Sequence, residues 1–164
     1  MEQKVEKIYS KSKHKNDLKF LKKAFAIAKK SQDPNTQVGA VIVNKQNEIV
    51  SIGVNGFFNV LKKSDQKWTS APDADWIDTK YPYVIHAEMN AVANAIKKNK
   101  SLVGCKIYVT LCPCNECLKN LIHFGIKQVI YGGITERHAN LPVFKASFKI
   151  AKSNGLVFKQ LSID

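Results

Sequence analysis

In Tyr83-Val84-Ile85-His86-Ala87-Glu88-Met89-Asn90, an imidazole is followed two residues later by a carboxylate. A second stretch, Leu111-Cys112-Pro113-Cys114-Asn115-Glu116-Cys117, offers two thiols three residues apart, directly after a proline. A catalytic zinc ion typically takes three protein ligands and keeps its fourth position for water or substrate. The two stretches therefore predict a zinc site formed by His86, Cys114 and Cys117, with Glu88 as a nearby carboxylate that does not bind the metal.

Both stretches lie where a predicted strand passes into a predicted helix. Apolar residues recur at helical spacing over 85–98, and residues 106–110 alternate as a strand. Pro113 is expected at the first position of a second helix that Gly125 closes. In open α/β sheets ligands gather beyond the carboxyl ends of strands, and helix N-termini favour thiolates. We therefore expect the two helix starts to meet around the metal.

Strand and helix patterns alternate along the rest of the chain. We expect residues 1–15 to form a basic N-terminal arm and 16–164 to form a single domain. The polar stretch 55–82, with Trp68 and Trp76, predicts an ordered loop that packs against another part of the protein. The order of elements predicts a three-layer α/β/α fold with a five-stranded mixed sheet, an antiparallel opening hairpin and right-handed parallel crossovers. The expected elements are a helix capped by Asn16 or Asp17 and running to about 30, strands at 38–43, 49–54 and 128–131, a helix at 143–152 and a strand at 156–158.

Composition sets broad limits on the class of protein. The 164 residues carry 26 Lys+Arg against 13 Asp+Glu, for a net charge of +13. This balance suits partners that bear phosphate, from a mononucleotide to RNA. No apolar run is long enough for a transmembrane helix, and residues 1–15 lack the apolar segment of a signal peptide. We therefore expect a cytoplasmic protein without a membrane partner, in which Cys105 and Cys112 are buried core thiols.

The zinc motif predicts hydrolytic deamination rather than a structural metal site. A carboxylate beside the metal can take a proton from zinc-bound water and return it to a leaving group. H-x-E alone and C-x-x-C alone are weak signals, but H-x-E followed by P-C-x-x-C is the signature of zinc deaminases. A structural zinc would need a fourth ligand. The nearest spare thiol, Cys112, precedes Cys114 by two residues at a strand end, which is poor geometry for sharing the ion.

The residues around this motif carry a more specific resemblance. From about residue 18 to 130 the chain resembles the deoxycytidylate (dCMP) deaminases, with Asn115 and Glu116 between the two cysteines as one of the more specific signs. The segments that carry the resemblance are Asp33-Pro34-Asn35-Thr36-Gln37-Val38-Gly39-Ala40, Gly53-Val54-Asn55-Gly56, Lys80-Tyr81-Pro82-Tyr83-Val84-Ile85-His86-Ala87-Glu88-Met89-Asn90-Ala91 and Tyr108-Val109-Thr110-Leu111-Cys112-Pro113-Cys114-Asn115-Glu116-Cys117.

The resemblance implies a cytidine-deaminase-like fold and a hydrolase that converts dCMP to dUMP and ammonia, which supplies thymidylate synthesis. Zinc-bound water would attack C4 of the pyrimidine, with Glu88 as the proton shuttle. The resemblance further implies that Asn35 contacts the sugar and that the backbone N–H of Ala87 bonds the pyrimidine carbonyl. The carbonyl of Thr110 would lie near the leaving amino group.

The resemblance also implies regulation and assembly. Members of the family form homo-oligomers, commonly hexamers, and many respond to dCTP and dTTP through a G-Y-N-G segment. Here the matching residues are Gly53, Asn55 and Gly56, and Val54 replaces the usual tyrosine. For the 5′-phosphate, Lys97, Lys98 and the lysines near Lys62 are candidates.

Two other readings stay open. A polynucleotide deaminase, acting on a tRNA adenosine or on single-stranded DNA, would use the basic charge for backbone contacts. Such enzymes carry other residues inside P-C-x-x-C, so we expect no nucleic-acid partner. A zinc-stabilised scaffold that has lost activity would be expected to lack a ligand or the glutamate, and all four residues are present.

Overall fold

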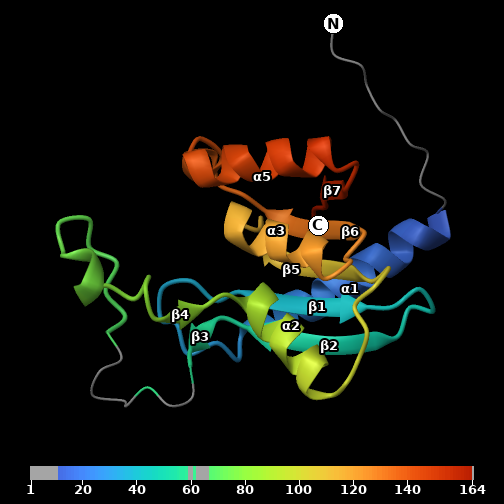
Figure 1. Ribbon diagram of the computed structural model, residues 1–164, viewed down its shortest axis with the longest axis horizontal. Helices are drawn as coiled ribbons and strands as arrows, with labels where there is room; N and C mark the ends of the chain where they lie inside the picture. Colours follow the sequence, from blue (N-terminus) through green and yellow to red (C-terminus); the bar gives the residue numbers. More distant parts are fainter. Residues whose placement is uncertain (1–10, 59–60, 62–66, 164) are drawn as a thin grey trace, which may run out of the picture.

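The structure is a computed structural model that describes residues 11–58, 61 and 67–163. A five-stranded sheet in the order β2-β1-β5-β6-β7 forms its centre (Figure 1). Its strands are β1 (Gly39–Val43), β2 (Ile49–Val54), β5 (Lys106–Leu111), β6 (Gln128–Gly133) and β7 (Val157–Gln160). The helices are α1 (Lys11–Ala28), α2 (Ala87–Lys97), α3 (Asn115–His123), α4 (Glu136–Ala139) and α5 (Pro142–Ser153).

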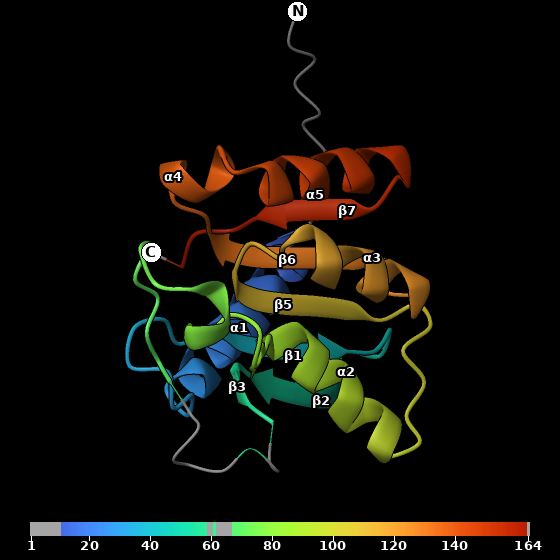
Figure 2. The ribbon, with the colours of Figure 1, turned by 60° about the vertical axis from the view of Figure 1, so that its left-hand side comes forward.

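The sheet is mixed. Strand β1 runs antiparallel to both of its neighbours, β2 and β5, whereas β5, β6 and β7 run parallel to one another. Helix α1 covers one face, and α2, α3 and α5 lie on the other (Figure 2). The predicted three-layer α/β/α fold with a five-stranded mixed sheet is therefore confirmed. In the described ranges, no helix is long and apolar enough to cross a membrane.

Alternation along the strands divides the core into two layers. Val41 and Val43 pack with Leu21 and other apolar residues of α1, whereas Ile42 packs against the opposite layer with Ala91 of α2. Successive side chains of a strand point to opposite faces, so the fully buried β1 separates the two cores. The predicted core thiols Cys105 and Cys112 are both buried.

Two glycines set the distance between helices and sheet. A Cβ atom at Gly39 would clash with the backbone of α1 at Ala24, and one at Gly53 would clash with the backbone of α2 at Ala87. Helix α2 therefore lies directly on β2, and its first turn has a fixed position. This matters because His86 and Glu88 belong to that end of α2.

Several predicted boundaries are wrong. The first helix begins at Lys11 rather than beside Asn16 or Asp17, so part of the predicted arm is helical; residues 1–10 lie outside the described residues, and the division into arm and domain stays a prediction. The third long helix, α3, begins after Cys114 and not at Pro113. The four-residue helix α4 was not predicted.

The described part of the 55–82 loop is ordered. Strand β3 (Gly56–Phe57) pairs with β4 (Val84–Ile85), and η2 (Trp76–Asp78) forms a short 3-10 helix. Trp68 packs against Phe57 with ring centroids 4.3 Å apart, as the sequence predicted. Trp76 does not pack against the protein in this way, because it is 61% exposed.

Candidate metal and catalytic site

The predicted zinc ligands lie at the starts of two helices. His86 is the N-cap residue of α2, directly after β4. Cys114 is the N-cap residue of α3, three residues after β5 ends, and Cys117 follows in the first turn of α3. Neither N-cap side chain bonds to the helix backbone, so both stay available as metal ligands.

The three side chains converge on one point. The Nδ1 atom of His86 lies 3.3 Å from Sγ of Cys117 and 3.7 Å from Sγ of Cys114. All three ligand atoms lie within 4.8 Å of one another. Zn–S and Zn–N bonds in a tetrahedron imply ligand separations of about 3.5–3.8 Å, so the set fits a zinc ion with one position left for water.

Electrostatics at the site favour a thiolate at Cys114 and a thiol at Cys117. The pKa of Cys114 is lowered to about 4, because hydrogen bonds from the Cys117 thiol and His86 outweigh the effect of burial. The pKa of Cys117 is raised, since it donates its proton to that sulfur and is buried. One proton is thus shared between two sulfurs at a helix N-terminus, and a metal ion there would displace it.

Glu88 lies in the first turn of α2 and is 4% exposed. Burial raises the pKa of its carboxyl group, and the positive charge of His86 opposes that rise. A raised pKa makes a carboxylate a stronger proton acceptor, which a general base requires. Position and burial therefore suit Glu88 to proton transfer beside the metal.

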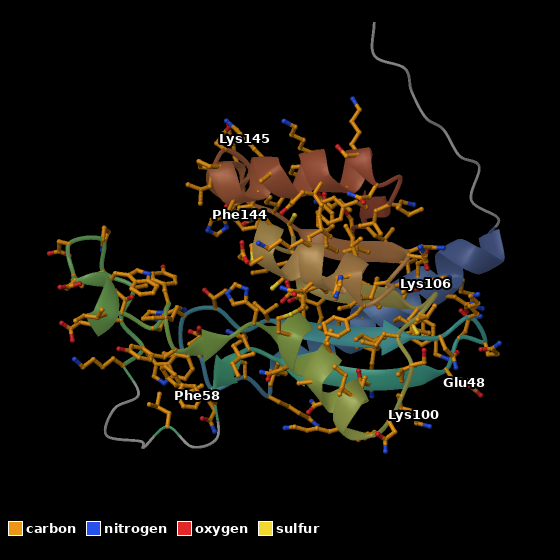
Figure 3. The ribbon with its side chains drawn as sticks, viewed as in Figure 1. Glu48, Phe58, Lys100, Lys106, Phe144 and Lys145 are labelled. Carbon is orange, nitrogen blue, oxygen red and sulfur yellow. The ribbon has the colours of Figure 1, made fainter. Side chains whose placement is uncertain are left out.

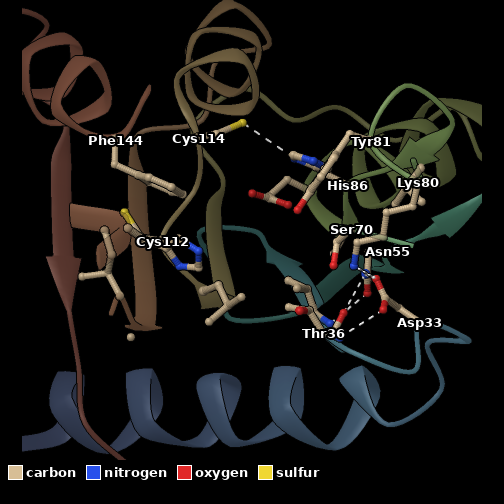
Figure 4. A pocket seen from close by; sticks show the side chains of 18 residues that line it. Asp33, Thr36, Asn55, Ser70, Lys80, Tyr81, His86, Cys112, Cys114 and Phe144 are labelled. Carbon is tan, nitrogen blue, oxygen red and sulfur yellow. Dashed lines mark hydrogen bonds and ion pairs between the residues drawn. The ribbon is translucent and has the colours of Figure 1, made fainter. Parts of the chain in front are cut away.

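A cavity of about 240 Å³ lies over these residues. Figure 4 shows His86 and Cys114 along its upper wall, Phe144 and Cys112 on one side, and a polar group on the other side. Burial raises the pKa of Cys112 to about 12, which leaves it a neutral thiol. The polar group consists of Asp33, Thr36, Asn55, Ser70 and Lys80, and we call it the polar end of the cavity.

Of the predicted substrate contacts, the structure brings one to the cavity wall. Ala87 lines the cavity at the first position of α2, where a backbone N–H has no acceptor within the helix. Thr110 is buried in β5, and its hydroxyl accepts a hydrogen bond from the Gly39 backbone N–H. The Asn35 side chain donates to the Trp68 carbonyl instead of facing the cavity. The roles of these residues stay predictions.

The predicted effector residues have structural contacts in this chain. Gly53 packs on α2, and Gly56 faces open space. The Asn55 side chain accepts from the backbone N–H of Val38 at 2.8 Å and donates to the Thr36 carbonyl at 2.8 Å. An effector role for Gly53, Asn55 and Gly56 therefore stays a prediction.

The lysines predicted to bind phosphate do not reach the cavity. Lys97 and Lys98 are exposed at the C-terminal end of α2, about 15 Å along the helix from its start. Figure 3 shows Lys100, just beyond that end, well away from Phe144 on the cavity wall. Lys62 lies outside the described residues.

Comparison with known families matches this site. The family model described as "Cytidine and deoxycytidylate deaminase zinc-binding region" covers residues 14–133. The chain belongs to this deaminase family. Zinc is the metal of the family's binding region, and His86, Cys114 and Cys117 form a cluster in this chain that could hold it.

Individual relatives agree with the family assignment. The human deoxycytidylate deaminase is 49% identical over 112 residues, which cover 68% of this chain and 61% of the human protein. The mouse deoxycytidylate deaminase is 41% identical over 143 residues, 87% of this chain and 78% of the mouse protein. The matched segment thus spans less than two thirds of the human relative.

A solved structure supports the fold of this chain. The dCMP deaminase of cyanophage S-TIM5, crystallised with dCMP and dUMP, aligns with a TM-score of 0.71 at 22% identity. The alignment covers 93% of this chain and the whole of the phage chain. At that identity the likeness shows a shared fold.

The sequence does not predict the polar end of the cavity. Lys80 stands out only as part of a segment that carries the family resemblance, and nothing in the sequence assigns a role to Ser70. A single lysine among 26 lysines and arginines gives no signal of spacing or period. The proline that separates Tyr81 from Tyr83 was a hint that Lys80 precedes a fixed turn, and the structure shows that turn.

Proposed function

We propose that the protein is a zinc-dependent deaminase that hydrolyses dCMP to dUMP and ammonia. The main structural support is that the buried carboxylate of Glu88 lies beside the cluster of His86, Cys114 and Cys117 at the wall of a cavity. Relatives that are 41–49% identical carry the name deoxycytidylate deaminase. A supply of dUMP for thymidylate synthesis and a cytoplasmic location belong to the same proposal.

The roles of the residues follow from their positions. His86, Cys114 and Cys117 would hold the zinc ion, which would lower the pKa of a bound water and so supply a nucleophile near neutral pH. As the water oxygen adds to C4 of the pyrimidine, Glu88 accepts one water proton and passes it to ring nitrogen N3. Glu88 then takes the second proton from the new C4 hydroxyl and delivers it to the amino nitrogen, so that the C4 carbonyl forms. The C4–N bond then breaks, and ammonia leaves. The backbone N–H of Ala87 orients the ring through its carbonyl.

Burial explains why one carboxylate can serve in both steps. Glu88 is 4% exposed, so its charged form is poorly hydrated and gains from accepting a proton. Its backbone is held in the first turn of α2, which Gly53 fixes against β2. The carboxylate therefore needs no rearrangement between proton uptake and release.

The test is an absorbance assay for loss of the amino group, run in parallel on dCMP, CMP, deoxycytidine and dCTP. We expect the largest kcat/KM for dCMP. Turnover of deoxycytidine without turnover of dCMP would refute the substrate assignment. The same assay in the presence of dCTP and dTTP tests the proposed effector response, and sedimentation tests the proposed homo-oligomer.

The net charge of +13 favours one alternative, a polynucleotide deaminase. Binding to a polynucleotide releases counterions and weakens steeply as salt rises, whereas a mononucleotide makes few such contacts. A salt series on the dCMP assay, with single-stranded DNA and tRNA as competing substrates, separates the two functions.

A further inference from the structure

The polar end of the cavity is not used by the proposed zinc chemistry. Figure 4 shows Asp33, Thr36, Asn55 and Lys80 joined by hydrogen bonds, with Ser70 beside them. The segment after α1, the end of β2 and the loop before β4 all contribute to this group. Three separate parts of the chain thus converge on a place where no metal ligand lies.

The polar end contains a buried ion pair. Nζ of Lys80 lies 2.6 Å from Oδ2 of Asp33, and their side chains are 10% and 1% exposed. An ion pair taken out of water adds little net stability, and an apolar pair of similar size can replace it without loss. Fold stability alone therefore does not explain a lysine at this cavity wall.

Both carboxylate oxygens of Asp33 accept hydrogen bonds from neighbouring residues. One carboxylate oxygen accepts from the backbone N–H groups of Asn35 and Thr36, at 2.9 and 3.0 Å. The other accepts from Lys80 and, at 3.3 Å, from the Asn55 side chain. Four donors saturate a carboxylate. Asp33 is thus a fixed support that holds the Lys80 ammonium group in one place.

Lys80 keeps hydrogen-bonding capacity for a ligand. An ammonium group has three N–H donors, and among the described residues Asp33 is the only hydrogen-bond acceptor for Nζ. The hydroxyls of Thr36 and Ser70 line the same end and make no side-chain hydrogen bond to any residue in the described ranges. Both of these residues are exposed, so the polar end is also the open end of the cavity. Hydrogen-bond donors and an ammonium group at the open end of a cavity are suited to binding an anion.

We propose that Lys80 binds the 5′-phosphate of the nucleotide substrate and so makes the enzyme prefer a nucleotide to a nucleoside. Asp33 acts as a positioning residue, because it holds the ammonium group without touching the substrate, and Asn55 supports Asp33 by donating to the same carboxylate oxygen. The inference rests on the proposed function, since it assumes a substrate with a phosphate. Phosphate oxygens form short, strong hydrogen bonds with ammonium donors, and a lysine already held in place loses little entropy on binding.

His138 is the competing candidate on the opposite side of the cavity. Its ring packs against Phe144 at a centroid distance of 5.6 Å, and both residues line the cavity. An aromatic ring is thus the neighbour of His138 on that side, whereas the Lys80 ammonium group is held by an ion pair with Asp33. The polar end around Lys80 also supplies additional donors, so we assign the phosphate to it.

The test compares kcat/KM for dCMP and deoxycytidine in the zinc-loaded wild type and in four variants. Lys80→Met should lower kcat/KM for dCMP by about 10- to 100-fold, the range for a hydrogen bond to a charged group, and leave the value for deoxycytidine unchanged. Lys80→Arg should keep part of the preference for dCMP over deoxycytidine. Lys98→Met, a matched loss of charge at the far end of α2, should change neither value. An equal loss for both substrates in Lys80→Met, or a dCMP-selective loss in His138→Gln instead, overturns the assignment.

A binding measurement separates this inference from the proposed function. Wild type that fails to deaminate dCMP refutes the proposed function, but calorimetric titration with dUMP and deoxyuridine still tests Lys80. Weaker dUMP binding in Lys80→Met, with deoxyuridine unchanged, supports the inference, whereas unchanged or undetectable dUMP binding overturns it. Should Lys80→Met fail to fold, Ser70→Ala and Thr36→Val take its place. If these variants lower kcat/KM several-fold for dCMP but not for deoxycytidine, the phosphate site is supported. If they lower neither value, or both equally, the assignment is overturned.

Discussion

Replacing Asp33 by asparagine removes the charge that compensates Lys80 and puts an NH2 donor where an oxygen accepts from Lys80 and Asn55. We expect Asp33→Asn to lower the free energy of unfolding by about 3 kcal/mol near neutral pH. Loss of one partner from a buried ion pair costs about 3–5 kcal/mol, because the other charge is left without compensation. The lower end applies because the Lys80 side chain is still 10% exposed and an asparagine Oδ1 can accept from the same two backbone N–H groups.

The pH dependence of this cost has a definite sign. Burial opposes ionisation of Asp33, but the hydrogen bond from Lys80 and those from the Asn35 and Thr36 backbones outweigh it and lower the pKa below 3.8. A carboxyl group with a lowered native pKa contributes stability above its ordinary pKa and loses it as the pH falls through the native value. The difference in free energy of unfolding between wild type and Asp33→Asn should therefore be largest near neutral pH and shrink below about pH 4.

The assay is urea unfolding at about pH 7, 5 and 3, followed by tryptophan fluorescence, with all proteins metal-free because protonation of the ligands releases zinc in acid. The matched control is Asp78→Asn, because the Lys67–Asp78 pair is more than half exposed on both sides. That change should cost less than about 1 kcal/mol. A cost for Asp33→Asn that stays constant from pH 7 to pH 3, or that equals the cost of the control, would refute the reasoning.

Three further variants test the site and its support. Glu88→Gln should keep the fold and one zinc per chain but lose turnover by about 100- to 10,000-fold; steady-state kinetics and metal analysis check this, and near-normal turnover would exclude Glu88 as proton shuttle. Cys114→Ala should lose zinc and activity together, and metal analysis that still finds one zinc per chain would show that the ligand set is wrong. Gly53→Ala should cost about 1–3 kcal/mol of stability and also lower kcat, because its methyl group would push α2 away from β2. Gly56→Ala, with nothing within 4 Å of its Cβ position, is the control, and equal unfolding midpoints for the two variants would contradict this account.

The cluster that could hold a metal was predictable because its residues lie at short spacings. Glu88 follows His86 by two positions, and Cys117 follows Cys114 by three. Each pair lies at one helix start, so local structure alone orients it. The helix boundaries were less accurate because the N-cap position at Cys114 depends on where the chain leaves β5, and a proline can precede a cap as well as follow it.

The polar end of the cavity could not be predicted for a different reason. Asp33 and Lys80 are 47 residues apart, and Asn55 joins them only because β2 returns beside β1. No spacing in the sequence encodes such a contact. Asn55 was likewise assigned to an effector site by resemblance, whereas its amide is occupied by Thr36 and Val38.

The N-caps of α2 and α3 have a consequence for local stability. Capping side chains normally satisfy the free N–H groups of a helix start, but His86 and Cys114 make no such bond. The first backbone hydrogen bonds of the two helices run from Asn90 to His86 and from Leu118 to Cys114, so both end at residues of the metal cluster. We therefore expect bound zinc to stabilise these first turns and to lower the rate at which they open.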